Sequence, residues 1–145
     1  MPSRIEETLL HAQFLARHLD ENDLQCAVIA VLVDLGFATN RDGFAYLVQA
    51  VMLFVGDPSL RATKDIYSLI SGCAGAGDDG LIENAIRCVI YEAWENRDES
   101  VWRIYFRSNQ NGAVKKPTNT SFISQVGYFM ILWQACCRKE ARIGK

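Results

Sequence analysis

The stretch "AGAGDDGLIENAIRCVIYEAW", from Ala74 to Trp94, combines a turn-like start with the clearest helical pattern of the chain. Its small and acidic start is typical of a turn, and the apolar residues after it recur at steps of three and four, as on one face of a helix. We therefore predict a turn followed by a helix of about four turns. The helical pattern contains a single basic residue, Arg87, so its leading face is nearly uncharged.

The same helical spacing extends outward through most of the chain, whereas the alternation of a strand is nearly absent. Gly36 is predicted to stop a helix, because a residue without a Cβ adopts the left-handed conformation easily. Thr63 is predicted to cap the helix at residues 63–71. The sequence predicts an all-α domain of six or seven helices, over residues 3–20, 22–35, 40–55, 63–71, 79–96, 99–106 and a last helix that is capped by Asn119 or Thr120 and reaches Cys137.

The composition bounds the class of protein. The chain has 145 residues, of which 50% are hydrophobic, and this is enough for one domain with its own core. The N-terminus lacks the basic start and apolar run of a signal peptide, and the apolar run "CAVIAVLV" is too short to span a bilayer. We expect a cytoplasmic protein with no membrane partner. Its predicted organisation is an amphipathic helix at 1–20, a main domain at 21–138 and a basic tail at 139–145.

Charge is distributed unevenly along the chain. Through Gly80 there are 5 Lys and Arg against 11 Asp and Glu, and from Leu81 onward there are 10 against 6. The first part is therefore acidic and the second basic. Such an asymmetry permits a polyanionic partner for the second part, although an ordinary solvated surface gives the same pattern.

Sequence signatures of catalysis or of cofactor and metal binding are missing. The run "GCAGAG" lacks the preceding strand of a dinucleotide loop, and no phosphate-binding loop motif occurs. His11 and His18 lie two turns apart, too far to share a metal alone. Asp78 and Asp79 stand at a helix start, where carboxylates cap backbone N–H groups. The five cysteines form no CxxC pair, and we expect most of them in the core. We predict no enzyme, no cofactor and no metal.

Two of the predicted helices have the order of a helix-turn-helix. A short helix at 63–71, a compact turn and a longer helix at 79–96 follow one another, and in that motif the second helix enters the major groove by its N-terminal half. Any helical bundle contains such pairs, so this pattern alone leaves a purely structural pair open.

Three motifs carry a resemblance to a known family. The runs "LGFATNRDGFAYLVQAV", "LIENAIRCVIYEAW" and "KKPTNTSFISQV" occur in this order and resemble the C-terminal effector domain of the sporulation initiation factor. The resemblance spans roughly residues 22–133. It implies an all-helical domain that reads double-stranded promoter DNA through a helix-turn-helix, commonly as two copies side by side.

The resemblance also implies roles for particular residues. Glu83 and Arg87 match positions on the groove-facing side of the recognition helix. Arg87 is the candidate for a guanine or phosphate contact, and Glu83 either accepts from a cytosine amino group or orients Arg87. The tail motif is matched by residues 116–119, of which Pro117 to Asn119 indicate a helix start. Lys116 and the preceding Lys115 are candidates for phosphate contacts. Trp102 and Phe106 match the segment where the family meets RNA polymerase, with core anchoring as the alternative role.

The chain departs from the family pattern at Leu81 and Asn84, where the family has arginines. Losing two positive groups weakens a phosphate-dominated interaction. Asn84 can still recognise a base, because asparagine pairs bidentately with adenine. We expect either a changed sequence preference or a loss of DNA reading.

A second departure is the N-terminal segment. The family carries a receiver domain before the effector domain, and the 145 residues here leave no room for one. The first helix instead has an apolar stripe that docks on the domain or pairs with a second copy; its members are Ile5, Leu9, Ala12, Ala16 and Leu19. The leading hypothesis is a receiver-less DNA-binding transcriptional regulator, with a homodimer on DNA. The alternative is a protein-interaction module on the same fold that binds RNA polymerase or the full regulator.

Overall fold

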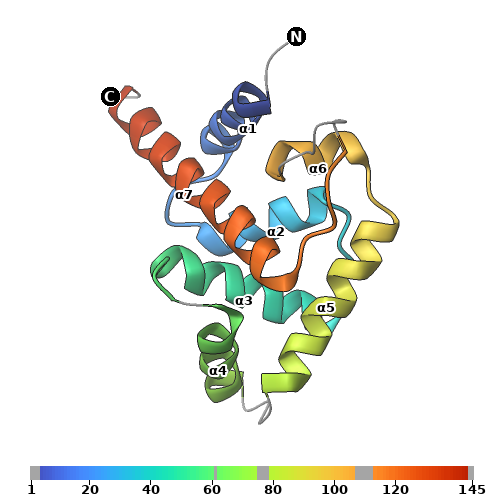
Figure 1. Ribbon diagram of the computed structural model, residues 1–145. Helices are drawn as coiled ribbons and strands as arrows, with labels where there is room; N and C mark the ends of the chain where they lie inside the picture. The colour runs from blue at the N-terminus through green and yellow to red at the C-terminus, as the bar shows by residue number, and fades with distance from the viewer. Residues whose placement is uncertain (1–3, 61, 75–78, 107–112, 144–145) are drawn as a thin grey trace.

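Seven helices form in the computed structural model, which describes residues 4–60, 62–74, 79–106 and 113–143 (Figure 1). Within these ranges no strand element occurs, so the predicted all-α class is confirmed. Thr63 lies inside its helix rather than before it, so its predicted role as a cap is wrong. The helices are α1 (Arg4–His18), α2 (Leu24–Asp34), α3 (Asp42–Gly56), α4 (Ala62–Ala74), α5 (Asp79–Glu95), α6 (Glu99–Tyr105) and α7 (Asn119–Ile143).

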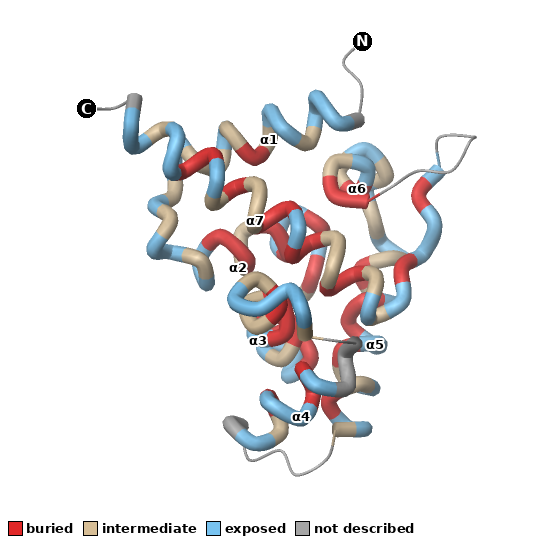
Figure 2. Tube along the Cα trace, turned by 60° about the vertical axis from the view of Figure 1, so that its left-hand side comes forward, coloured by how far each residue is buried: buried red, intermediate tan, exposed pale blue. Residues whose placement is uncertain are grey.

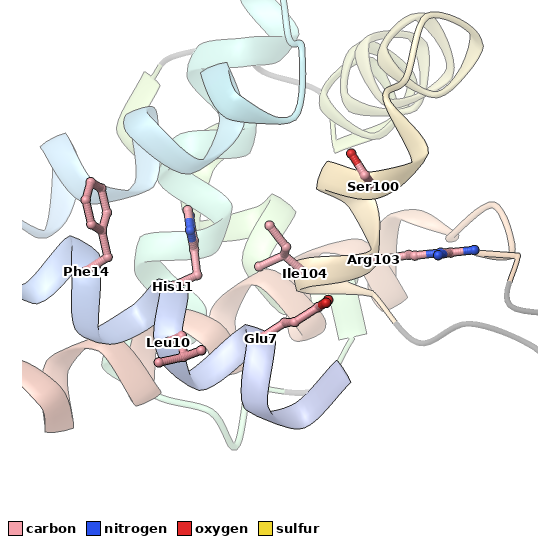
Figure 3. A pocket seen from close by; sticks show the side chains of 7 residues that line it. All are labelled: Glu7, Leu10, His11, Phe14, Ser100, Arg103 and Ile104. Atoms are coloured by element: carbon pink, nitrogen blue, oxygen red, sulfur yellow. The ribbon is translucent and has the colours of Figure 1, made fainter. Parts of the chain in front are cut away.

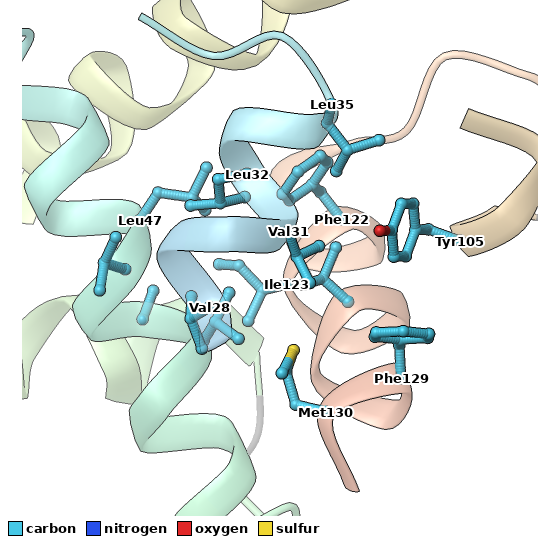
Figure 4. Packing of buried hydrophobic residues seen from close by; sticks show 14 of the residues in the cluster. Val28, Val31, Leu32, Leu35, Leu47, Tyr105, Phe122, Ile123, Phe129 and Met130 are labelled. Carbon is cyan, nitrogen blue, oxygen red and sulfur yellow. The ribbon is translucent and has the colours of Figure 1, made fainter. Parts of the chain in front are cut away.

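The core lies where α2, α3 and α7 meet. Val28 and Leu32 of α2 are fully buried, and they pack among apolar side chains of α3 and α7 (Figure 4). Each fully buried aliphatic side chain of this size stabilises the fold by about 1.5–3 kcal/mol relative to an exposed one. Figure 2 shows the same distribution, with buried positions in the middle of the molecule and exposed stretches on α1 and α4.

The end of α2 follows the sequence prediction. Gly36 has a φ of +94°, in the left-handed region that favours glycine. Its N–H donates to the carbonyl oxygen of Val33, and the Phe37 N–H donates to that of Leu32, over 3.0 and 3.1 Å. These bonds satisfy carbonyl groups at the helix end, and the chain turns so that Phe37 enters the core.

Two glycines set how closely the central helices approach one another. A Cβ at Gly43 of α3 would overlap the backbone carbonyl of Ala85 in α5, and one at Gly127 of α7 would overlap the ring of Phe54 in α3. Because glycine has no side chain, α3 lies directly against both neighbours. The contact with α3 therefore fixes the position of α5 and of its exposed face.

The helix α1 docks on α6 and α7 of its own chain. Ala12 is fully buried, and Thr8 Oγ1 donates to the carbonyl oxygen of Ile104 over 2.6 Å. The predicted apolar stripe is partly wrong, because Ile5 is 73% exposed and Leu9 is 40% exposed. The face of α1 that meets α6 and α7 instead contains Thr8 and Ala12, which lie four residues apart and therefore on the same side of the helix.

The helix α7 is longer than predicted. It runs past Cys137 to Ile143, so residues 139–143 of the predicted basic tail are helical. Its last turns bind the N-terminal region, because Arg138 Nε pairs with Glu21 Oε1 over 2.8 Å. The division of the chain into helix, main domain and tail otherwise stays a prediction.

The start of α7 differs from prediction in its capping residue. Thr118 Oγ1 accepts the backbone N–H of Ser121 over 3.1 Å, and the Thr118 carbonyl oxygen accepts that of Phe122. Thr118 is therefore the cap, and Asn119 and Thr120 lie inside the helix. This frees the Asn119 side chain for the other contacts described below.

Candidate nucleic-acid interface

The helices α4 and α5 meet at the end of the molecule opposite α1 (Figure 1). Ser68 Oγ of α4 donates to Asp79 Oδ2 at the start of α5 over 2.7 Å. This bond ties the first turn of α5 to the helix before it. The connection at 75–78, with the predicted cap Asp78, lies outside the described residues. The two helices have the order predicted for a helix-turn-helix.

The helix α5 has one buried face and one exposed face. Its buried side chains recur with helical spacing and pack on α3 and α4: Ile82, Ile86, Val89, Ile90 and Ala93. The opposite face carries Leu81, Asn84 and Arg87, which are exposed and stand at successive steps of three. Residues three apart lie near one another along a helix, so these side chains form one stripe in the first half of α5.

Arg87 is held in place by the two polar residues before it. Its Nη2 donates to Glu83 Oε1 over 2.7 Å, and its Nη1 donates to Asn84 Oδ1 over 3.1 Å. The Arg87 side chain is 59% exposed and that of Glu83 is 47% exposed, so solvent screens the ion pair. The geometry fits the predicted orienting role of Glu83, and it aims the guanidinium fork along the exposed face.

Lys116 and Arg87 line one hollow beside α5. The hollow has a volume of about 380 Å³ and is also lined by Pro117 and Asn119 at the start of α7. Lys116 Nζ lies 4.2 Å from the ring centre of Tyr91. Such a cation–π contact holds an ammonium group near a surface while leaving its protons accessible. Lys115 is exposed beside it.

Asn119 joins the three helices that surround this face. From its position in the sequence it was predicted only to stand at a helix start. Its Nδ2 donates to the Tyr67 hydroxyl of α4 over 2.9 Å and to the carbonyl oxygen of Glu83 in α5 over 3.0 Å. The side chain therefore locks α4, α5 and α7 together. The signal in the sequence was the motif "KPTN", but its meaning depends on contacts 36 and 52 residues away.

The charge of α5 is unusual for a helix that meets DNA. It carries Asp79, Glu83, Glu92 and Glu95 against Arg87 alone. Other cations beside α5 include Lys115 and Lys116 of the flanking segment and Arg41, which pairs with Glu92 over 3.2 Å. Long-range attraction of α5 to phosphates is therefore weak, and short-range contacts must carry more of any recognition.

Trp102 and Phe106 are core residues. Both are buried, their rings stack with centroids 5.0 Å apart, and Trp102 Nε1 donates to the Leu35 carbonyl oxygen over 3.1 Å. Neither side chain is exposed enough to contact a partner. Their alternative role, core anchoring, is the one that the packing supports, because α6 enters the core through them.

The outward side of α6 borders a separate cavity of about 480 Å³ against α1 (Figure 3). Leu10, His11 and Phe14 line it from α1, and Arg103 and Ile104 line it from α6. At its inner edge the Tyr105 hydroxyl donates to Asp34 Oδ2 over 2.9 Å and lies 2.8 Å from His11 Nε2. Burial and the Asp34 carboxylate raise the pKa of Tyr105, so its hydroxyl stays protonated.

The cysteines and histidines of the described chain form no metal-binding group. His11 contacts Tyr105, and His18 Nδ1 donates to the Phe14 carbonyl oxygen over 2.9 Å. Cys136 and Cys137 are buried, and burial raises the pKa of Cys137 to about 11, with the Glu21 and Asp20 carboxylates adding to the rise.

The expectation of mostly buried cysteines holds only for that pair. Cys26 and Cys88 are exposed, because both stand on the outer faces of their helices. The side chain of Cys73 lies outside the described part of the chain. Among the described helices, none is long and apolar enough to cross a membrane.

The described residues thus form an all-α domain in which one face of α5 is exposed and carries Leu81, Asn84 and Arg87. Residues 28–128 match the family of the sporulation initiation factor Spo0A C-terminal domain. The match covers more than half of the chain, so this protein belongs to that family of DNA-binding regulators of transcription in sporulation. The resemblance inferred from three motifs is confirmed.

The matched segment leaves out the helix α1 and the last turns of α7. These two unmatched segments pack against each other, since Cys137 Sγ donates to the Leu19 carbonyl oxygen over 3.6 Å and Arg17 pairs with Glu140. Together they form a layer outside the matched segment, the added layer, at the end of the molecule away from α4 and the start of α5 (Figure 1).

Proposed function

We propose that this chain regulates transcription by reading promoter DNA through α4 and α5, with the first half of α5 in the major groove. The observation that carries the proposal is the exposed stripe on α5 that ends in Arg87, opposite the face packed on α3 and α4. Arg87 offers a planar fork of donors to guanine or to a phosphate, and Glu83 fixes its orientation. Lys115 and Lys116 contact phosphates beside the groove.

The experiment is a binding titration on double-stranded promoter fragments at several salt concentrations. The log of the affinity falls with the log of salt by about 0.9 for each phosphate contact. We expect Arg87→Ala to weaken binding and Lys116→Ala to reduce the slope by about one unit. Lys139→Ala, an exposed cation in the added layer, is the matched control and leaves the slope unchanged. Absence of binding at low salt, or full binding by Arg87→Ala, contradicts the proposal.

The proposed complex contains two copies of the chain side by side on DNA. This follows from the family resemblance, and α5 lies on a side of the domain that the added layer leaves open. Sedimentation of a saturated DNA complex should give two chains per duplex. A single chain on every bound duplex contradicts this arrangement.

A second function is favoured by the acidic character of α5. Four carboxylates on one helix, together with the exposed Leu81, suit contact with a basic protein surface better than contact with phosphates. In this alternative the domain binds RNA polymerase or the full regulator, and α6 contributes through its exposed residue Arg103 rather than through its buried aromatic rings. Binding of purified RNA polymerase without any DNA binding would select this function, and Arg103→Ala should then weaken it.

A further inference from the structure

The first exposed side chain of α5 is apolar, and the fold does not use it. Leu81 is 61% exposed, whereas its neighbour Ile82 is fully buried on the opposite face. A single exposed leucine is common on protein surfaces and alone indicates nothing. Its position is what matters here, because it stands one turn before Asn84 on the stripe that continues to Arg87.

The three residues of the stripe match three different groups on base edges. Leucine offers an apolar surface of the kind that meets the C5-methyl group of thymine, asparagine pairs with adenine N6 and N7, and arginine pairs with guanine O6 and N7. In a helix that enters the major groove by its N-terminal half, the first turns reach the base edges. An apolar residue at that position can contact a base methyl group, whereas it cannot neutralise a phosphate.

We propose that Leu81 determines specificity by contacting the C5-methyl group of a thymine, next to an adenine paired with Asn84. This inference rests on the proposed reading of DNA by α5, and it names the DNA that the helix prefers: a short element with thymine and adenine ahead of the guanine at Arg87. A methyl contact needs no cation, and the low positive charge of α5 is therefore compatible with specific binding.

Asn84 can read adenine without releasing Arg87. Its Oδ1 accepts one bond from Arg87 Nη1, and an amide oxygen has two lone pairs. The second lone pair accepts the adenine N6 amino group while Nδ2 donates to N7. Glu83 holds the guanidinium from its other side, so the stripe is oriented before DNA arrives. Preorganisation of this kind reduces the entropic cost of ordering side chains on binding.

The test begins with selection of duplexes from a random double-stranded library by the wild-type chain. In a selected duplex each thymine is then replaced by uracil, which lacks only the C5-methyl group, and affinities are compared at one salt concentration. We expect one replacement to weaken binding about fourfold, the effect of one buried methyl-sized group. Replacing the neighbouring adenine by 7-deazaadenine, which lacks the N7 acceptor but keeps the N6 amino group, should weaken binding about fivefold, the lower end of the discrimination given by a bidentate pair.

The variant Leu81→Ala should bind the thymine and uracil duplexes equally. Its matched control is Leu10→Ala, an exposed leucine on α1, which should keep the fourfold preference. The thymine-to-uracil comparison uses the wild-type chain, so it does not depend on the folding of any variant.

Each result separates the inference from the function on which it rests. If the wild-type chain selects no DNA, the proposed function fails and the inference fails with it. If it selects DNA but tolerates uracil at every thymine, or if Leu81→Ala keeps the preference, the methyl contact is wrong while DNA reading by the domain stands.

Discussion

The helix α6 and the first half of α5 were both predicted to contact a partner, but the side chains named for that role differ in solvent exposure. The aromatic residues of α6, Trp102 and Phe106, are sealed in the core, whereas Leu81 and Asn84 of α5 are exposed. A motif thus identifies a segment, but only burial decides which of its side chains can touch a second molecule. Large aromatic groups contribute most where they leave water, and here that place is the core.

Removing the ring of Trp102 tests most strongly whether α6 and the first half of α5 differ in this way. The variant Trp102→Ala leaves a cavity between Leu35, Phe106 and Phe122, and we expect it to lower the free energy of unfolding by about 3–5 kcal/mol. Leu81→Ala should change that free energy by less than about 0.5 kcal/mol, because surface substitutions have small effects. Urea denaturation followed by circular dichroism measures both. Equal effects of the two variants would mean that the contrast between the segments is false.

A second prediction concerns the contact that positions α5. In Gly43→Ala the added methyl group overlaps the Ala85 carbonyl, and α3 and α5 must move apart. We expect a loss of about 1–3 kcal/mol in the free energy of unfolding, as for other overpacked sites. The matched control is Gly72→Ala in α4, where nothing lies near the new methyl group, and it should stabilise the helix by about 0.5–1 kcal/mol. Thermal melts of the two variants should shift in opposite directions.

The smallest expected effect is a pH dependence at the start of α6. The Val114 N–H donates to Glu99 Oε1 and Arg97 Nε donates to Glu99 Oε2, both over 2.7 Å, and these contacts hold the pKa of Glu99 below its usual value. Because the folded-state pKa is depressed, the stabilisation is present above the unfolded pKa and is lost as the pH falls through the folded pKa.

The variant Glu99→Gln should therefore be less stable than the wild type above the unfolded-state pKa of about 4.3, and approach it as the pH falls through the lower folded-state pKa. The side chain is partly solvated, so we expect a difference under about 1 kcal/mol. Denaturation curves at several pH values give the comparison, and Glu95→Gln on the exposed side of α5 is the control. A difference that persists at low pH would point to packing rather than charge at Glu99.

Sequence patterns were reliable for the helices and unreliable for their rotation. The periodicity located every helix of the described chain, and Gly36 ended α2 as predicted. The stripe of α1 was misassigned at Ile5 and Leu9, because an amphipathic helix with several apolar sides can dock by more than one of them. Thr118 rather than Asn119 caps α7, although asparagine is the stronger capping residue, because the Asn119 side chain bonds to α4 and α5 instead.

The sequence motifs indicated which segments form the candidate site. The tertiary contacts bring these segments together. Glu83 and Arg87 lie four residues apart, so their pairing follows from helix geometry and was foreseeable. The contact of Lys116 with Tyr91 and the bonds of Asn119 to α4 and α5 join segments distant in sequence, and no local pattern encodes them.

Local patterns in the sequence were enough to predict the all-α class, the end of α2 at Gly36 and the family of DNA-binding regulators, because these depend on local propensity, period and motif. The tertiary structure decided that Trp102 and Phe106 belong to the core, that α1 covers the end of α7, and that Leu81, Asn84 and Arg87 share one open face. The reason is physical: burial depends on which helices pack together, and packing is settled by contacts between residues far apart in the chain.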